Sequence, residues 1–161
     1  MSIGLSKIKC LIYPFTHGII GRKEVVSMIS TKGRYALRVM LYLARENSEG
    51  YIPLKDIAEK EQISKKYLEI IVKELVGAGL LTGLSGKGGG YRLVRKPEEY
   101  SVGEILEVTE GSLSVVACLE KGAQPCPKAA GCETLPMWSE LDKMIHDFFS
   151  EKKLTDLIRN N

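Results

Sequence analysis

Three of the four cysteines, Cys118, Cys126 and Cys132, lie within one short segment of the chain. Seven residues separate the first two, five separate the last two, and glycines and prolines between them loosen the segment. Thiolates are soft ligands that suit iron–sulfur clusters or zinc, and three from one loop leave a fourth ligand position for another group. The spacing favours an iron–sulfur cluster, with zinc and redox-active or incidental thiols as alternatives.

The cysteine content also indicates a cellular compartment. A group of three thiols cannot pair off completely, and the apolar stretch 10–20 is interrupted by Pro14 and His17, lacks a small-residue cleavage site and is too short to span a bilayer. We therefore expect a cytoplasmic protein that does not associate with membranes, in which clustered thiols bind metal or undergo redox chemistry. Cys10 lies far from the segment, and we expect it to be incidental.

Charge is divided unevenly along the 161 residues. Residues 28–97 carry 13 Lys and Arg against 7 Asp and Glu, whereas residues 98–161 carry 6 against 12. Such a division concentrates positive potential on one module, as binding to a polyanion requires, although chance segregation of surface charge gives the same count. The composition, 44% hydrophobic and 27% charged, excludes a largely disordered chain.

The basic module contains the pattern of three helices and a hairpin. Apolar residues recur at steps of three and four from Tyr35 to Ala44, and a short helix is expected after Pro53. Residues 61–63 form a turn, and Ser64 is a good N-cap for a third helix with a buried stripe. That stripe comprises Leu68, Ile71, Val72 and Leu75. Strands at 80–84 and 91–94 flank the glycine-rich residues 85–90, which predicts a β-hairpin.

The acidic half predicts two more helices around the cysteine segment. Ser101 and Glu104 have the spacing of a capping box, so a helix should begin there and end at Gly111. The last helix carries Trp138, Leu141, Ile145 and Phe148, spaced like a coiled-coil seam. A lone helix cannot bury such large side chains, so this one must pack on the first domain or on a second subunit.

This order of elements is that of a winged helix-turn-helix. We predict a mainly α fold with a small β-hairpin: a winged helix-turn-helix DNA-binding domain plus a long C-terminal dimerisation helix. Residues 1–27 would be a poorly ordered N-terminal extension, 28–97 the DNA-binding domain, and 98–161 a linker helix, a cysteine-rich cluster loop (118–132) and the dimerisation helix.

The start of the longer helix should meet the major groove of double-stranded DNA. Lys65 and Lys66 are candidates for phosphate contacts, Ser64 and Tyr67 for contacts to phosphates or base edges, and Glu69 for a cytosine amino group. The other candidates are Lys87 at the hairpin tip, for the minor groove, and Arg34 and Arg38 on the first helix, for the backbone. Each lysine taken alone has an alternative role as a solvated surface charge.

Enzyme motifs are absent from the sequence. There are two histidines, no Ser-His-Asp, metal-hydrolase or nucleotide-binding motif, and no Cys-x-x-Cys pair. We therefore expect a protein that is not an enzyme.

Residues 30–37, 63–69 and 86–91, together with the three cysteines followed by Trp138, resemble the IscR and NsrR type of iron-sulfur transcription regulators over residues 28–152, and IscR-like members most closely. The resemblance implies a homodimer whose C-terminal helices pair and whose wings grip a partly palindromic operator. It also implies a cluster on Cys118, Cys126 and Cys132, with the two-iron form [2Fe-2S] favoured over the four-iron form [4Fe-4S].

The chain departs from the family pattern at three positions. Leu135 stands where IscR-like members carry histidine, Arg34 where nitric-oxide sensors carry aspartate, and Ser85 where the wing often has arginine. The fourth ligand is therefore unassigned, with Glu133 nearby and His146 more distant.

The predicted function is a repressor that senses iron–sulfur status and controls genes of cluster assembly or cysteine metabolism. Two alternatives remain open. One is a metal-free thiol or cysteine-metabolism regulator of the same family, and the other is a zinc-stabilised protein-interaction module.

Overall fold

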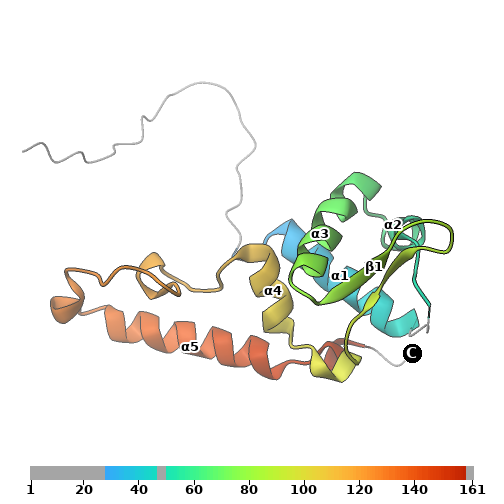
Figure 1. The fold of residues 1–161 in the computed structure, drawn as a ribbon. Helices are drawn as coiled ribbons and strands as arrows, with labels where there is room; N and C mark the ends of the chain where they lie inside the picture. Colours follow the sequence, from blue (N-terminus) through green and yellow to red (C-terminus); the bar gives the residue numbers. More distant parts are fainter. Residues whose placement is uncertain (1–27, 47–49, 159–161) are drawn as a thin grey trace, which may run out of the picture.

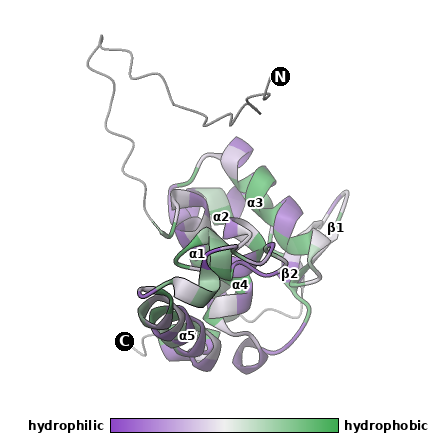
Figure 2. Ribbon diagram, turned by 90° about the vertical axis from the view of Figure 1, so that its left-hand side faces the viewer, coloured by the Kyte–Doolittle hydropathy of each residue, from purple (hydrophilic) through white to green (hydrophobic). Residues whose placement is uncertain are grey.

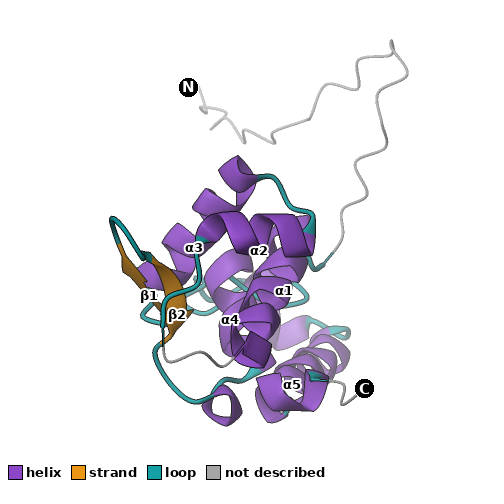
Figure 3. Ribbon diagram, turned by 90° about the vertical axis from the view of Figure 1, so that its right-hand side faces the viewer, coloured by secondary structure: helices purple, strands orange, loops and turns teal. Residues whose placement is uncertain are grey.

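The computed structural model describes residues 28–46 and 50–158; the expected N-terminal extension, 1–27, lies outside the described residues. The described chain forms five α-helices and one two-stranded antiparallel sheet (Figures 1 and 3). The helices are α1 (Thr31–Glu46), α2 (Leu54–Glu61), α3 (Lys65–Gly77), α4 (Val102–Glu110) and α5 (Leu135–Glu151), and the strands are β1 (Leu81–Leu84) and β2 (Gly90–Leu93). The predicted mainly α fold with a small β-hairpin is confirmed.

The core lies between α1, α3 and α4. The predicted stripe of α3 is buried, and so is the inner face of α1. Tyr100 and Ile105, near and on α4, and Leu154 after α5 belong to the same buried cluster. Burying apolar side chains of this size contributes about 1.5–3 kcal/mol each relative to exposure.

The turn between α2 and α3 has a defined geometry. Gln62 ends α2 in the left-handed region with φ of 52°, and among the described residues no other non-glycine residue has a positive φ. The Ser64 hydroxyl then accepts a hydrogen bond from the Tyr67 backbone N–H, the N-cap that the sequence predicts. The turn therefore fixes where the first residues of α3 emerge from the body.

The hairpin formed by β1, β2 and the intervening residues, called the wing from here on, is held by a third extended segment. Ile52 and Tyr91 exchange two backbone hydrogen bonds of 3.0 and 2.9 Å. A Cβ on Gly90 would lie 2.1 Å from the Ile52 carbonyl oxygen, so this close approach requires glycine. The wing is thereby anchored to the residues immediately before α2.

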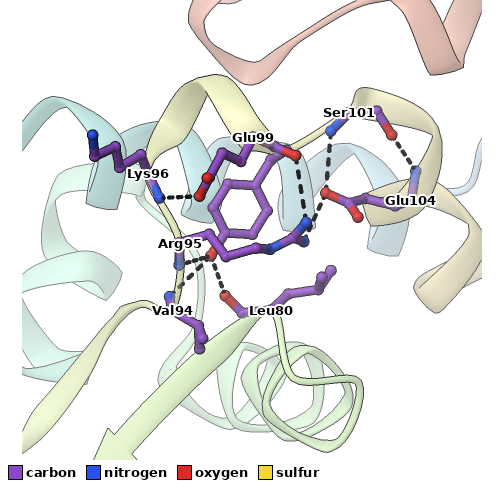
Figure 4. Close-up of polar contacts among 8 residues, drawn as sticks. Leu80, Val94, Arg95, Lys96, Glu99, Ser101 and Glu104 are labelled. Carbon is purple, nitrogen blue, oxygen red and sulfur yellow. Dashed lines mark hydrogen bonds and ion pairs between the residues drawn. The ribbon is translucent and has the colours of Figure 1, made fainter.

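Tyr100 connects the wing to α4 (Figure 4). Its buried hydroxyl donates to the Leu80 carbonyl oxygen at 2.9 Å and accepts from the backbone N–H groups of Val94 and Arg95 at 2.9 and 2.8 Å. Ser101 then caps α4 in the predicted capping box with Glu104. The Tyr100 hydroxyl thus bonds three backbone groups, those of Leu80, Val94 and Arg95.

The chain returns to the body after α5. The Val102 N–H donates to the Lys152 carbonyl oxygen at 2.8 Å, and the Leu154 N–H donates to the Tyr100 carbonyl oxygen at 3.0 Å. The Leu154 side chain is fully buried in the core. These bonds fix the C-terminal end of α5 against the start of α4.

The rest of α5 extends away from the body, on the side opposite the wing (Figure 1). None of its residues is fully buried. The most exposed apolar side chains are Met137 (52%), Leu141 (39%), Met144 (61%) and Phe148 (56%), and Figure 2 shows α5 with apolar and polar residues around its circumference. Of the predicted seam, Trp138 and Ile145 are half-buried.

Candidate functional site

Five of the eight predicted DNA contacts lie together at the start of α3. Ser64, Lys65, Lys66 and Glu69 are exposed, and Tyr67 is half-buried. The three others lie elsewhere: Lys87 is exposed in the loop of the wing, and Arg34 and Arg38 are exposed on α1. The Arg34 guanidinium donates to the Thr31 hydroxyl at 3.1 Å.

Tyr67 packs against α1, and sequence reasoning missed this contact. Its ring meets the Tyr35 ring edge-on, with centroids 5.8 Å apart. The Arg38 guanidinium lies 5.4 Å from the Tyr35 centroid, and its Nε donates to the Glu61 carboxylate at 2.8 Å. Arg38 is therefore bonded to the end of α2, and Tyr35 couples it to Tyr67.

A second ion pair joins the segment after β2 to α4. Arg95 donates to Glu104 Oε1 at 2.9 Å and stacks 4.3 Å from the Tyr100 centroid (Figure 4). The hydrogen bond to Glu104 raises the pKa of Arg95 above its ordinary value. The segment after β2 is thus fixed both by the Tyr100 hydroxyl and by this pair.

The predicted metal ligands lie on one loop between α4 and α5. Cys118 and Cys126 are exposed, Cys132 is half-buried, and all three are free thiols. Cys132 Sγ lies 3.5 Å from the Thr134 hydroxyl, and this hydrogen bond lowers the pKa of the Cys132 thiol. Within residues 28–46 and 50–158, no three His, Cys, Asp or Glu side chains converge as metal ligands. The three thiols suit an iron–sulfur cluster in their chemistry, but they do not meet at one point.

The candidates for a fourth ligand differ in their surroundings. Glu133 is exposed beside Cys132, and Leu135 begins α5. His146 lies farther along α5, where its Nδ1 is 2.9 Å from the Asp142 carbonyl oxygen and 3.4 Å from Asp142 Oδ2. The other oxygen of Asp142 accepts from the Val115 backbone N–H at 3.0 Å, which ties the start of the cysteine segment to α5.

Residues 29–160 match the family model Rrf2, which is described as an iron-dependent transcriptional regulator. The chain belongs to the Rrf2 family. The IscR regulator of Aliivibrio salmonicida, described as an HTH-type transcriptional regulator, is 37% identical over 133 residues, which cover 83% of this chain and 78% of that relative. The IscR of Pectobacterium atrosepticum is 35% identical, over 82% of this chain and 79% of that relative.

Two solved structures share the Rrf2 fold and more than a quarter of their residues with this chain. CymR, the global cysteine regulator of B. subtilis, superposes with a TM-score of 0.64 at 34% identity, over 80% of this chain and 94% of CymR. T. potens IscR gives a TM-score of 0.62 at 30% identity, over 83% and 93%. The stated resemblance is confirmed, and the chain is a DNA-binding transcription regulator of the Rrf2 family.

The family also confirms that the protein is not an enzyme, since its relatives are named as transcriptional regulators. No helix in the described part of the chain is both long enough and apolar enough to cross a membrane.

Proposed function

We propose that this Rrf2 regulator is a cytoplasmic homodimeric repressor whose affinity for its operator depends on an iron–sulfur cluster bound by Cys118, Cys126 and Cys132. The observation that carries the proposal is that three free, accessible thiols share one loop, and that this loop leads directly into α5. The two-iron cluster is favoured over the four-iron cluster.

Operator recognition is assigned to the start of α3 and to the wing. Lys65 and Lys66 would neutralise phosphates, and Ser64 and Tyr67 would donate to phosphates or base edges. Glu69 would accept a hydrogen bond from a cytosine amino group, because a carboxylate next to phosphates is otherwise repelled. Lys87 would enter the minor groove or contact its edge, and Arg34 would contact the backbone.

Dimerisation is assigned to α5. This helix of 17 residues exposes an apolar face made of Met137, Leu141, Met144 and Phe148. Contact of such a face with water is unfavourable. The same face on a second copy would cover it, with the two helices packed side by side.

The three thiolates would hold the cluster, with the fourth position filled by a group still unassigned. When bound, the cluster supplies sensitivity to iron supply and to oxidation. It alters DNA binding only if it binds two forms of the protein with different affinity. The genes controlled would be those of cluster assembly or cysteine supply, and the similarity to CymR, which is described as a global cysteine regulator, supports the second.

Anaerobic purification with iron and sulfide counting tests the cluster directly. The parent and a Cys10→Ser control should give brown protein with visible absorption, and the triple variant Cys118→Ser, Cys126→Ser, Cys132→Ser should be colourless and iron-free. A colourless, iron-free parent that binds its operator equally well would remove the sensing role. Stoichiometric zinc without iron would instead favour a zinc-stabilised interaction module.

A second candidate is a metal-free thiol regulator of the same family. The similarity to CymR, including a structure of its oxidized form from Staphylococcus aureus at 32% identity, favours it, as do three thiols accessible to oxidants. This candidate predicts no iron in any preparation and a change in operator affinity on thiol oxidation alone.

A further inference from the structure

A groove of about 660 Å³ lies between the start of α2, one side of α3 and the wing. Three lysines line it: Lys55 from α2, and Lys65 and Lys73 from α3. Val76 and Leu84, both partly exposed, form apolar parts of its walls. Only Lys65 of these belongs to the predicted DNA contacts, so the groove extends beyond the surface assigned above.

The charged side chains that line the groove are all positive. None of the described residues that line it is acidic. Lys65 and Lys73 make no ion pair with the described residues, and Lys55 lies 3.6 Å from Glu59 in a pair whose side chains are both more than two-thirds exposed. Such exposed pairs are weak, so all three ammonium groups remain available to an anion.

The spacing of the lysines fits an extended anion rather than a single small one. Lys65 and Lys73 are eight residues apart on α3, which separates their Cα atoms by about 12 Å along the helix axis. Phosphates of one DNA strand follow each other every 3.4 Å along the duplex axis. The two lysines therefore suit different phosphates of one strand, with Lys55 on the neighbouring helix facing the same groove.

The wall opposite α3 is held in place before any ligand arrives. The Ile52–Tyr91 hydrogen bonds and the close approach of Gly90 to Ile52 fix β2 against the start of α2. A Cβ on Gly89 would lie 2.2 Å from the Leu84 carbonyl oxygen, so the hairpin also closes tightly on itself. The width of the groove is consequently set by the fold.

We propose that Lys55 and Lys73, together with Lys65, bind the sugar–phosphate backbone of the operator where it passes between α3 and the wing. The inference rests on the proposed function, because it requires a duplex bound by both elements.

The salt dependence of binding tests this proposal. Fluorescence anisotropy would measure the binding constant for a duplex from the protein's own promoter between about 50 and 200 mM salt, and each phosphate contact contributes about 0.9 to the slope of log K against log salt. Because each substitution is present in both protomers of the proposed dimer, Lys55→Gln and Lys73→Gln should each make the slope shallower by about 1.8, on operator and on scrambled duplex alike. Lys73→Arg, which keeps the charge, should retain the parent slope.

Lys60→Gln is the matched control, because Lys60 is exposed on α2 but does not line the groove. It should leave the slope unchanged, and thermal melts should give the parent Tm for all four variants. Parent slopes in both groove variants, with the parent protein binding DNA normally, would overturn the groove assignment and leave the proposed function intact. A parent protein that binds no duplex would overturn both.

Discussion

Glu110, the last residue of α4, accepts two hydrogen bonds from Ser30, which lies eighty residues earlier at the start of α1. The Ser30 backbone N–H and hydroxyl lie 3.0 and 2.9 Å from the same carboxylate oxygen. The Ser30 hydroxyl oxygen in turn accepts from the Gly33 N–H at 3.2 Å. This contact joins the end of α4, from which the chain continues toward the cysteine loop 118–132, to the start of the first helix of the DNA-binding domain.

Removing the carboxylate should destabilise the fold. Glu110→Ala is expected to lower the free energy of unfolding by about 2 kcal/mol, because two hydrogen bonds to a charged group are lost and the Ser30 groups lose their partner. Urea denaturation of the protein measures the change. Glu107→Ala, an exposed position one turn earlier, is the control; an equal loss in both variants would contradict the role of this contact.

A methyl group at Gly33 should also break the contact. A Cβ there would lie 2.1 Å from Glu110 Oε1 and 3.2 Å from Leu106 Cδ2, so the carboxylate would have to leave Ser30. Gly33→Ala should therefore cost about 1–2 kcal/mol despite the better helix propensity of alanine. Gly77→Ala, where nothing lies within 4 Å, should instead stabilise by about 0.5–1 kcal/mol. Thermal unfolding of the two variants should shift Tm in opposite directions.

Gln62 offers a stabilising substitution in the turn of the helix-turn-helix. A side chain in the left-handed region costs about 1–2 kcal/mol, and glycine avoids that cost. Gln62→Gly should raise the free energy of unfolding by about 0.5–1 kcal/mol after the added backbone entropy is counted. Gln62→Ala keeps the strained conformation and should bring no gain. Equal stability of the glycine and alanine variants in urea would disprove the explanation.

The Tyr100 hydroxyl should be required for stability. Tyr100→Phe leaves the Arg95 backbone N–H without the hydroxyl, and it leaves the Val94 N–H and the Leu80 carbonyl oxygen only their mutual bond of 3.4 Å, at a cost of about 2 kcal/mol. Differential scanning calorimetry should show a clear fall in Tm. Tyr42→Phe, a half-buried tyrosine on α1, should change Tm little. A Tm for Tyr100→Phe equal to that of Tyr42→Phe would exclude the hydrogen-bonding role.

Local sequence signals predicted the local features of this fold. The buried stripe of α3, the Ser64 cap, the capping box at Ser101 and the glycine-rich wing all follow from periodicity and from side chains within a few residues. The same signals placed the cluster of candidate DNA contacts at the start of α3.

Long-range contacts had no such signal. Glu110 is one of 20 acidic residues, and nothing nearby in the sequence marks it as the partner of Ser30. The return of Leu154 to the core, and the support of Tyr67 by Tyr35, depend on how separate helices pack. The cysteine spacing predicted a shared loop, but spacing alone does not determine where flexible side chains lie relative to one another. Nothing in the sequence marks Lys55 and Lys73, because they line one groove with the wing only in the folded chain.

The proposed function requires that a thiolate-bound inorganic group changes how tightly this regulator binds DNA. The most direct measurement is the operator affinity of one anaerobic preparation before and after removal of its iron, at fixed low salt and with the triple cysteine variant alongside. We expect the operator affinity to change by about tenfold or more on iron removal, and the triple variant to show the iron-free affinity throughout, since coupling between sites is typically about 5–150-fold. Identical affinities in all three samples would contradict it.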